Sequence, residues 1–182
     1  SIKDDANYKA AIKQAGASAR SVYENLAEEI DRISRDFLKI VDKEEPYDVF
    51  ISYKRTDFDG MRTDDSKYAM KLYSYLVEKG YKVFFAEQTL GNVAGEKYEP
   101  YIFAALTSSK VMFLVGGRKE YVEATWVKNE WRRFLTLSAE DPQKTLIPVH
   151  IGGDIYKIFP QELLSTQGID AMSPSFVEES LA

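Results

Sequence analysis

The stretch Tyr47–Arg55 limits the possible folds more than any other part of the chain; it reads Tyr-Asp-Val-Phe-Ile-Ser-Tyr-Lys-Arg. Its apolar run Val49–Ile51 has no polar interruption, as expected of a strand that is buried on both faces of a parallel sheet. The chain then becomes polar at once, and in open α/β sheets ligands bind beyond the carboxyl ends of the strands. If this strand is central, Tyr53, Lys54 and Arg55 lie at a ligand-binding crevice.

From Pro46 onward, strand patterns alternate with helix patterns. Further strands are predicted at Tyr81–Ala86, Val111–Val115, Leu146–His150 (with a bulge or a local loss of pairing at Pro148) and Gly168–Ala171. Helices are predicted from an Asp64 or Asp65 cap to Lys79, at Pro100–Ser109, at Trp126–Leu137 capped by Thr125, around Phe159–Leu164 and from Ser173. The segment between the third strand and the Trp126 helix, Gly116–Ala124, is predicted to be a charged loop. This alternation predicts a flavodoxin-like α/β fold: a five-stranded parallel sheet in the order 2-1-3-4-5, with helices on both faces.

Residues 1–45 differ from the rest because they lack proline and are rich in alanine and charged residues. Apolar residues recur at spacings of three and four between Ala19 and Ile40, which predicts an α-helical segment with one apolar stripe. The stripe is either an oligomerisation seam or a face packed on the chain's own domain, and its short length slightly favours packing. We therefore divide the chain into a helical segment, 1–45, and a domain, 46–182. The serine at position 1 suggests a piece of a longer protein.

Composition excludes several classes of function. The chain has no cysteine, which rules out disulfides and thiolate chemistry and fits a cytoplasmic protein. It has one histidine, His150, so a mechanism with two histidines is also excluded. A net charge of −5 disfavours nucleic-acid binding, and no apolar run is long enough to span a membrane. Four aspartates crowd one loop (Asp57, Asp59, Asp64 and Asp65), but their spacing fits a solvated turn better than a cation site, so no metal is expected.

Trp126 and Glu130 are four residues apart and project from the same side of a predicted helix. They lie one step around from the core stripe of Val127, Trp131 and Phe134, at the border between core and solvent. Without further information, Glu130 reads as a solvated glutamate paired with Arg132 or Arg133, and Trp126 as an aromatic that packs at the rim.

Four short motifs nevertheless occur together in one order and spacing. They are the strand Tyr47–Tyr53, the strand Gly80–Phe85, the segment Gly95–Tyr98 before a helix that ends in Ala-Leu-Thr-Ser-Ser-Lys, and the stretch Trp126–Glu130. Together they resemble the Toll/interleukin-1 receptor (TIR) domain of the bacterial kind. The resemblance covers about residues 46–182.

Many bacterial TIR domains, and the animal TIR enzyme of axon degeneration, cleave NAD⁺ at the nicotinamide–ribose bond. The resemblance implies that Glu130 is the catalytic glutamate, that Trp126 and Tyr98 are aromatics near the substrate, and that Tyr53, Lys54 and Arg55 line the pocket. It also implies that Glu87–Lys97 is the family's mobile loop, with Thr89, Leu90, Gly91 and Gly95 in it. Self-association of TIR domains is expected, with two subunits completing one site.

The implied chemistry needs few groups. The nicotinamide of NAD⁺ is already a cationic leaving group, so no acid has to protonate it, and the remaining ribose resembles an oxocarbenium ion. One carboxylate can stabilise that charge. NAD⁺ is then the substrate, and neither a metal nor any other cofactor is expected. The resemblance implies a product that is ADP-ribose or a cyclic isomer, formed in bacterial immune or stress signalling.

Two alternatives remain open. A TIR domain can be a non-enzymatic scaffold, but animal adaptors carry Arg-Asp and Pro-Gly pairs in the loop that here reads Glu87-Gln-Thr-Leu-Gly-Asn-Val-Ala-Gly95. Enzymes similar to nucleoside 2-deoxyribosyltransferase share a related fold, although the Tyr47–Tyr53 motif disfavours them. Two departures from the family pattern also occur: Gly116-Gly117 replaces a common serine, and Trp131 replaces a common leucine.

Overall fold

The computed structural model describes residues 46–86 and 99–181. The predicted helical segment 1–45 lies outside the described residues. So do five predicted site or loop residues: Thr89, Leu90, Gly91, Gly95 and Tyr98.

Five parallel strands form one sheet in the order β2-β1-β3-β4-β5, which confirms the predicted topology. The strands are β1 (Val49–Tyr53), β2 (Val83–Phe84), β3 (Val111–Gly116), β4 (Thr145–His150) and β5 (Ile169–Asp170). The helices are α2 (Asp64–Glu78), α4 (Glu99–Ser108), α5 (Lys119–Val122), α6 (Thr125–Glu140), α7 (Ile155–Ile158), the 3₁₀ turn η3 (Gln161–Leu163) and α8 (Phe176–Glu179). None of these helices combines the length and the apolar character that crossing a bilayer requires.

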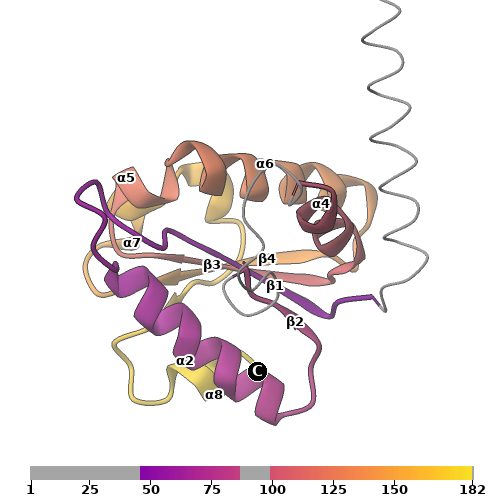
Figure 1. Cartoon of the computed structure of the whole chain (residues 1–182), viewed down its shortest axis with the longest axis horizontal. Helices are drawn as coiled ribbons and strands as arrows, with labels where there is room; N and C mark the ends of the chain where they lie inside the picture. Colours follow the sequence, from indigo (N-terminus) through magenta and orange to yellow (C-terminus); the bar gives the residue numbers. More distant parts are fainter. Residues whose placement is uncertain (1–45, 87–98, 182) are drawn as a thin grey trace, which may run out of the picture. The chain divides into compact units, whose positions relative to one another are not determined.

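Helices cover both faces of the sheet, as predicted (Figure 1). Because side chains alternate along a strand, Phe50 packs toward α4 and α6 while Val49 and Ile51 pack toward α2. The next residue on the Phe50 side is Ser52, which is also buried. The alternation in β1 therefore directs the Ser52 hydroxyl toward α6.

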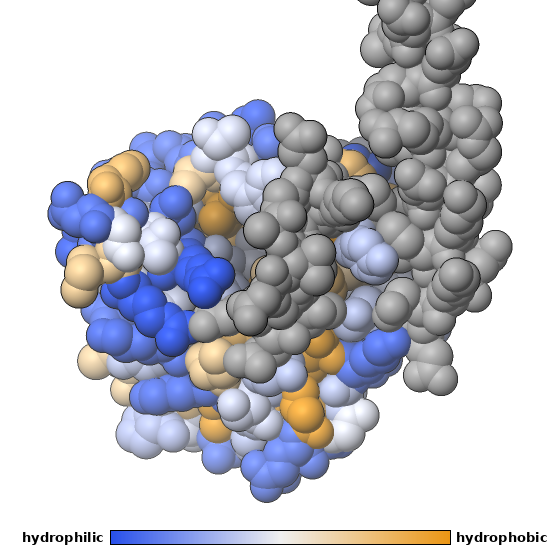
Figure 2. Space-filling view, viewed as in Figure 1, coloured by the Kyte–Doolittle hydropathy of each residue, from blue (hydrophilic) through white to orange (hydrophobic). Residues whose placement is uncertain are grey.

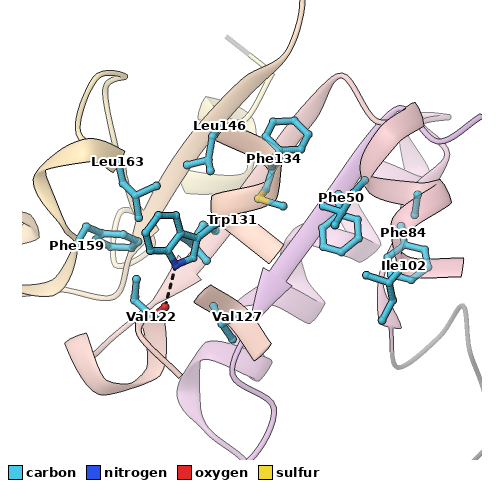
Figure 3. Close-up of a cluster of buried hydrophobic side chains, with 14 of the residues drawn as sticks. Phe50, Phe84, Ile102, Val122, Val127, Trp131, Phe134, Leu146, Phe159 and Leu163 are labelled. Carbon is cyan, nitrogen blue, oxygen red and sulfur yellow. Dashed lines mark hydrogen bonds between the residues drawn. The ribbon is translucent and has the colours of Figure 1, made fainter. Parts of the chain in front are cut away.

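Helix α6 is fixed to the α5 region by the indole of Trp131. This side chain is 1% exposed, and its Nε1 donates a hydrogen bond to the carbonyl oxygen of Val122 at 3.0 Å (Figure 3). Phe159 and Leu163 belong to the same buried cluster. A leucine at position 131 would have no N–H to donate, so the indole adds a polar link that orients the helix carrying Glu130.

The start of α2 differs from the prediction. The N-cap is Thr63, not Asp64 or Asp65: its side chain accepts a hydrogen bond from the backbone N–H of Ser66 at 3.1 Å. The two aspartates instead occupy the first helical turn, where the helix dipole favours negative charge. The helix ends at Glu78, and Gly80 adopts a positive φ of 89°, as predicted for a glycine just past the last turn.

The predicted charged loop after β3 contains a short helix, α5. Its residues Tyr121 and Val122 are buried, so apolar packing, not charge, determines this segment. Gly116 permits that packing, because a Cβ atom there would lie 2.4 Å from Cγ2 of Val122. Thr125 is not a cap either: α6 begins at Thr125 itself, and the N-cap residue Ala124 has no capping side chain.

Of the two outcomes predicted for Pro148, the structure has no bulge but does have a local loss of pairing, on the β5 side. Leu114 pairs with Pro148 in an unbroken register between β3 and β4. On the other side, the pairing with β5 begins at Val149, after the proline, so the missing N–H does not interrupt that ladder. Near the C-terminus, the short helix predicted around 159–164 is found as the 3₁₀ turn η3, preceded by the unpredicted α7, and the last helix begins at Phe176, not Ser173.

Candidate active site

A cavity of about 680 Å³ lies at the carboxyl end of β1, between the β1–α2 loop and the helices α5 and α6. This volume is within the range of roughly 300–1,000 Å³ that is usual for small-molecule sites. Charged and aromatic side chains are prominent in its lining, among them Lys54, Arg55, Phe58, Glu123, Trp126 and Glu130. The cavity has the position that the sequence predicted for a ligand-binding crevice.

Glu130 is the buried acid of this cavity. Its side chain is 9% exposed, and its Oε2 accepts a hydrogen bond from the Ser52 hydroxyl at 2.6 Å. One partner comes from the end of the central strand and the other from the helix that covers it, 78 residues later. The tertiary fold therefore assembles this pair.

The interpretation of Glu130 as a solvated glutamate at the border between core and solvent is wrong. Val127, Glu130, Trp131 and Phe134 are the buried residues of α6, and their spacing of three, four and seven is that of a single core-facing stripe. The two arginines that were its expected partners are exposed and lie elsewhere: the guanidinium of Arg133 is 3.8 Å from the Phe103 ring centroid, and that of Arg132 is 5.5 Å from Trp131.

Burial raises the pKa of Glu130 from 4.5 to about 7, since a charged carboxylate is poorly solvated there. Hydrogen bonds from Ser52 and from the side chain of Trp126 oppose this shift, because they stabilise the charged form. A carboxyl group with a pKa near neutrality can exist in either protonation state at physiological pH. A positive charge bound beside it would favour the carboxylate.

Trp126 lies at the first turn of α6 and lines the same cavity. Half of its side chain, 50%, is exposed, although it is a large aromatic. Its predicted proximity to Glu130 is therefore found, and the exposed half of the residue can contact a ligand in the cavity.

Basic and acidic residues line the cavity together. Lys54 and Arg55 follow β1 directly, as predicted, while Glu120 and Glu123 come from the α5 region. Tyr53 also lines the cavity, but its ring stacks on Phe85 with 4.9 Å between the centroids, on the α2 side of the sheet. The Tyr53 ring is thus engaged in packing.

Sequence reasoning missed Ser52, Phe58, Glu120 and Glu123. Ser52 had a usable signal: it is the one polar residue in step with Phe50 on a buried strand, so its hydroxyl needed a polar partner. The other three had none, because only the folded chain brings the β1–α2 loop and the α5 region to one cavity.

The remaining polar candidates lie apart from this cavity. His150 ends β4, where its Nδ1 is 3.2 Å from the carbonyl oxygen of Gly152. Asp57 binds backbone N–H groups of its own turn. Over residues 46–86 and 99–181, no three acidic or histidine side chains are grouped so that they could hold a metal ion.

Comparison with protein families gives a match to the family described as "TIR domain" over residues 49–180. No curated protein matches the chain in sequence. Solved structures do match, at low identity.

The TIR domains of the activated Roq1 resistosome, which directly recognises the pathogen effector XopQ, are 23% identical over 59% of this chain and 59% of that chain, with a TM-score of 0.43. A metazoan TIR-STING receptor from C. gigas is 24% identical over 64% of this chain and 35% of its own, with a TM-score of 0.47. The same receptor in complex with 2′,3′-cGAMP is 22% identical over 73% and 38%, with a TM-score of 0.53. The chain thus covers less than two thirds of each of these structures, and such identities show a shared fold alone.

Proposed function

The chain belongs to the TIR domain family, and on this premise we propose that it is an NAD⁺ glycohydrolase or ADP-ribosyl cyclase with Glu130 as its catalytic carboxylate. One observation carries the proposal. The glutamate that matches the family's catalytic position is a buried carboxyl group in a cavity of about 680 Å³, not a solvated surface residue.

The reaction begins when the bond between C1′ of the ribose and the nicotinamide nitrogen breaks. The bonding electrons leave with the base, which becomes neutral, and positive charge develops on the ribose. The Glu130 carboxylate stabilises that charge in a site of low dielectric constant, where such an interaction is strongest. Water then attacks C1′ and loses a proton, giving ADP-ribose; attack by an atom of the substrate's own adenine gives a cyclic isomer.

Four neighbouring side chains support this assignment. Ser52 donates to Oε2 and so fixes the orientation of the carboxyl group. The exposed face of Trp126 suits stacking on the nicotinamide. Lys54 and Arg55, on the β1 side of the cavity, suit the pyrophosphate. The balance of charges matches NAD⁺, whose base is cationic and whose bridge is anionic.

The direct test incubates the protein with NAD⁺ and identifies the products by mass and retention time. We expect nicotinamide together with ADP-ribose or a cyclic isomer. Glu130→Gln is the matched test variant, because it keeps the shape of the side chain and removes the charge. We expect it to lower the rate at least 10²-fold, the scale seen when one stabilising group is removed. Nicotinamide release at the wild-type rate by this variant would refute the catalytic role.

A non-enzymatic scaffold is the alternative, and absence of nicotinamide release by the wild-type protein at every protein concentration would favour it.

We further propose that the domain acts in the cytoplasm, in bacterial immune or stress signalling, and self-associates to complete its site. Activity per subunit should then rise with protein concentration. A rate per subunit that stays constant would argue against assembly.

A further inference from the structure

One aromatic side chain at the cavity is left exposed to an unusual degree. Phe58 lines the cavity but is 82% exposed, whereas burying a phenylalanine normally stabilises a protein. It stands in the β1–α2 loop between Asp57 and Asp59. Figure 2 shows apolar patches among mainly hydrophilic atoms on the flank that carries this loop.

The loop holds Phe58 in place through its backbone. Asp57 closes a tight turn: its N–H donates to the Met61 carbonyl at 2.8 Å, and its Oδ1 accepts from the N–H groups of Asp59 and Met61 at 3.0 and 2.8 Å. Gly60 supplies the positive φ of 80° that the turn requires. A bridge between Thr56 and Arg62 closes the loop below the turn. The ring is therefore presented to solvent by an ordered turn.

The base of the loop is tied to both neighbouring elements. The Thr63 hydroxyl donates to the carbonyl oxygen of Lys54 and accepts from the N–H of Ser66 in α2. The N–H of Thr63 donates to the Arg55 carbonyl at 3.1 Å. The residues that follow β1 thus have a fixed spatial order between the strand end and the loop tip.

That order parallels the order of the chemical groups in a dinucleotide. Ser52 is buried beside Glu130, Lys54 is half-buried, Arg55 is exposed, and Phe58 is the most exposed. In NAD⁺ the scissile ribose is followed by the pyrophosphate, the second ribose and the adenine. With the ribose at Glu130 and the pyrophosphate at Lys54 and Arg55, the adenine would extend toward the loop tip.

We propose that Phe58 is a stacking platform for the adenine ring of the dinucleotide, at the solvent-exposed side of the cavity. This inference rests on the proposed function for the identity of the ligand. A phenyl ring stacks on the face of a planar base without any hydrogen bond, and one such contact contributes on the order of tenfold in affinity. Stacking on Phe58 therefore makes the affinity of the site depend on the adenine half of the substrate.

The loop supplies its own control residue. Met61 is 67% exposed on the same turn but does not line the cavity. If Phe58 served only as part of a general apolar surface, for example against a second copy of the chain, Met61 would contribute to it as well. Stacking on a base requires Phe58 and not Met61.

The experiment compares Phe58→Ala, Phe58→Tyr and Met61→Ala with the wild-type protein. Calorimetry measures the binding of ADP-ribose, which contains adenine, and of nicotinamide mononucleotide, which does not. Phe58→Ala should weaken ADP-ribose binding about tenfold and leave nicotinamide mononucleotide unchanged. Phe58→Tyr, which keeps a ring, and Met61→Ala should bind both as the wild type does. In turnover, Phe58→Ala should raise KM for NAD⁺ about tenfold with kcat within twofold.

Three outcomes would overturn the inference. They are equal weakening of both ligands in Phe58→Ala, the same loss of ADP-ribose binding in Met61→Ala, and no ADP-ribose binding by the wild type. Because ADP-ribose lacks the nicotinamide–ribose bond and cannot undergo the proposed reaction, a wild type that binds ADP-ribose through Phe58 but releases no nicotinamide from NAD⁺ would refute the proposed reaction alone. The exposed position of Phe58 means that the alanine variant should melt close to the wild type.

Discussion

Glu130 and Asp65 are two buried carboxyl groups with similar electrostatics and different surroundings. Each is less than one tenth exposed, and burial raises the pKa of each to about 7. Glu130 lines the cavity between β1 and α6. Asp65 lies at the start of α2, on the opposite face of the sheet, and does not line that cavity.

The hydrogen bonds of the two groups also differ. The carboxyl group of Glu130 accepts from a side chain, the hydroxyl of Ser52. Oδ1 of Asp65 accepts from the backbone N–H of Gly117 at 2.8 Å, and Oδ2 is buried with no partner within the described part of the chain. Asp65 therefore ties α2 to the end of β3. A raised pKa alone does not identify a catalytic acid; a cavity at the group has to accompany it.

The largest measurable contrast after removal of the acid itself is the dependence of turnover on pH. In the proposed mechanism the carboxylate is the active form of Glu130, so kcat/KM for NAD⁺ should fall toward tenfold per pH unit below a pKa of about 7, or about 50-fold from pH 7 to pH 5. Asp65→Asn should show the same profile, because Asp65 does not line the cavity. If the fall in kcat/KM below pH 7 disappeared in Asp65→Asn, Asp65 and not Glu130 would be the acid whose titration controls turnover.

Removal of the Ser52 hydroxyl should have a smaller effect. This hydrogen bond lowers the pKa of Glu130, so Ser52→Ala should raise that pKa further and shift the rate profile to higher pH. We expect a loss of about tenfold in kcat/KM at pH 7, partly recovered at pH 9. Ser109→Ala is the matched control, since the Ser109 hydroxyl is buried without a described partner and lies outside the cavity. An unchanged profile in Ser52→Ala would break the link between this hydroxyl and the acid.

The two buried acids should make similar, pH-dependent contributions to the free energy of unfolding. A carboxyl group with a raised folded-state pKa binds more protons in the native state than in the unfolded state at intermediate pH. Its stabilising contribution to the free energy of unfolding is therefore fully present below about pH 4 and is lost as the pH rises to about 7. The amide variants remain neutral. From pH 5 to pH 8, the free energy of unfolding of Asp65→Asn and of Glu130→Gln should each improve by roughly 2 kcal/mol relative to wild type. Chemical denaturation at both pH values measures this, and a constant difference would contradict the raised pKa values.

The smallest effect concerns the backbone partner of Asp65. A Cβ atom at Gly117 would lie 3.1 Å from Oδ1 of Asp65 and 3.5 Å from Ile151. Gly117→Ala should therefore crowd the Asp65 region and cost about 1 kcal/mol of stability, as modest overpacking does. The pH profile of turnover should not move, and thermal melting together with that profile checks both statements. A displaced profile would mean that the two regions are coupled.

Much of the fold could be predicted because its signals are local. The continuous apolar run of β1 and the regular alternation of strand and helix patterns determine a parallel sheet and its order. The errors occurred where tertiary packing overrides local chemistry. Burial of Tyr121 and Val122 turned a charged segment into α5, and the Thr63 side chain, not an aspartate, capped α2.

The candidate site was predictable in part. The family resemblance identified Glu130, and the strand-end rule identified Lys54 and Arg55, which do line the cavity. The burial of Glu130 was missed because a charged residue was assumed to face solvent. Its position in the sequence nevertheless places it on the same helix face as the core residues Val127, Trp131 and Phe134. Phe58 and Glu123 could not be predicted, since their place at the cavity depends on how two distant segments pack.

The most direct test of the central claim measures nicotinamide release from NAD⁺ by Glu130→Gln and Asp65→Asn side by side at pH 8. Each substitution removes one buried acid whose pKa is raised to about 7. Asp65→Asn should retain a rate close to that of the wild type, and Glu130→Gln should lose at least about 10²-fold. Comparable losses in the two variants, or a surviving rate in Glu130→Gln, would contradict the account.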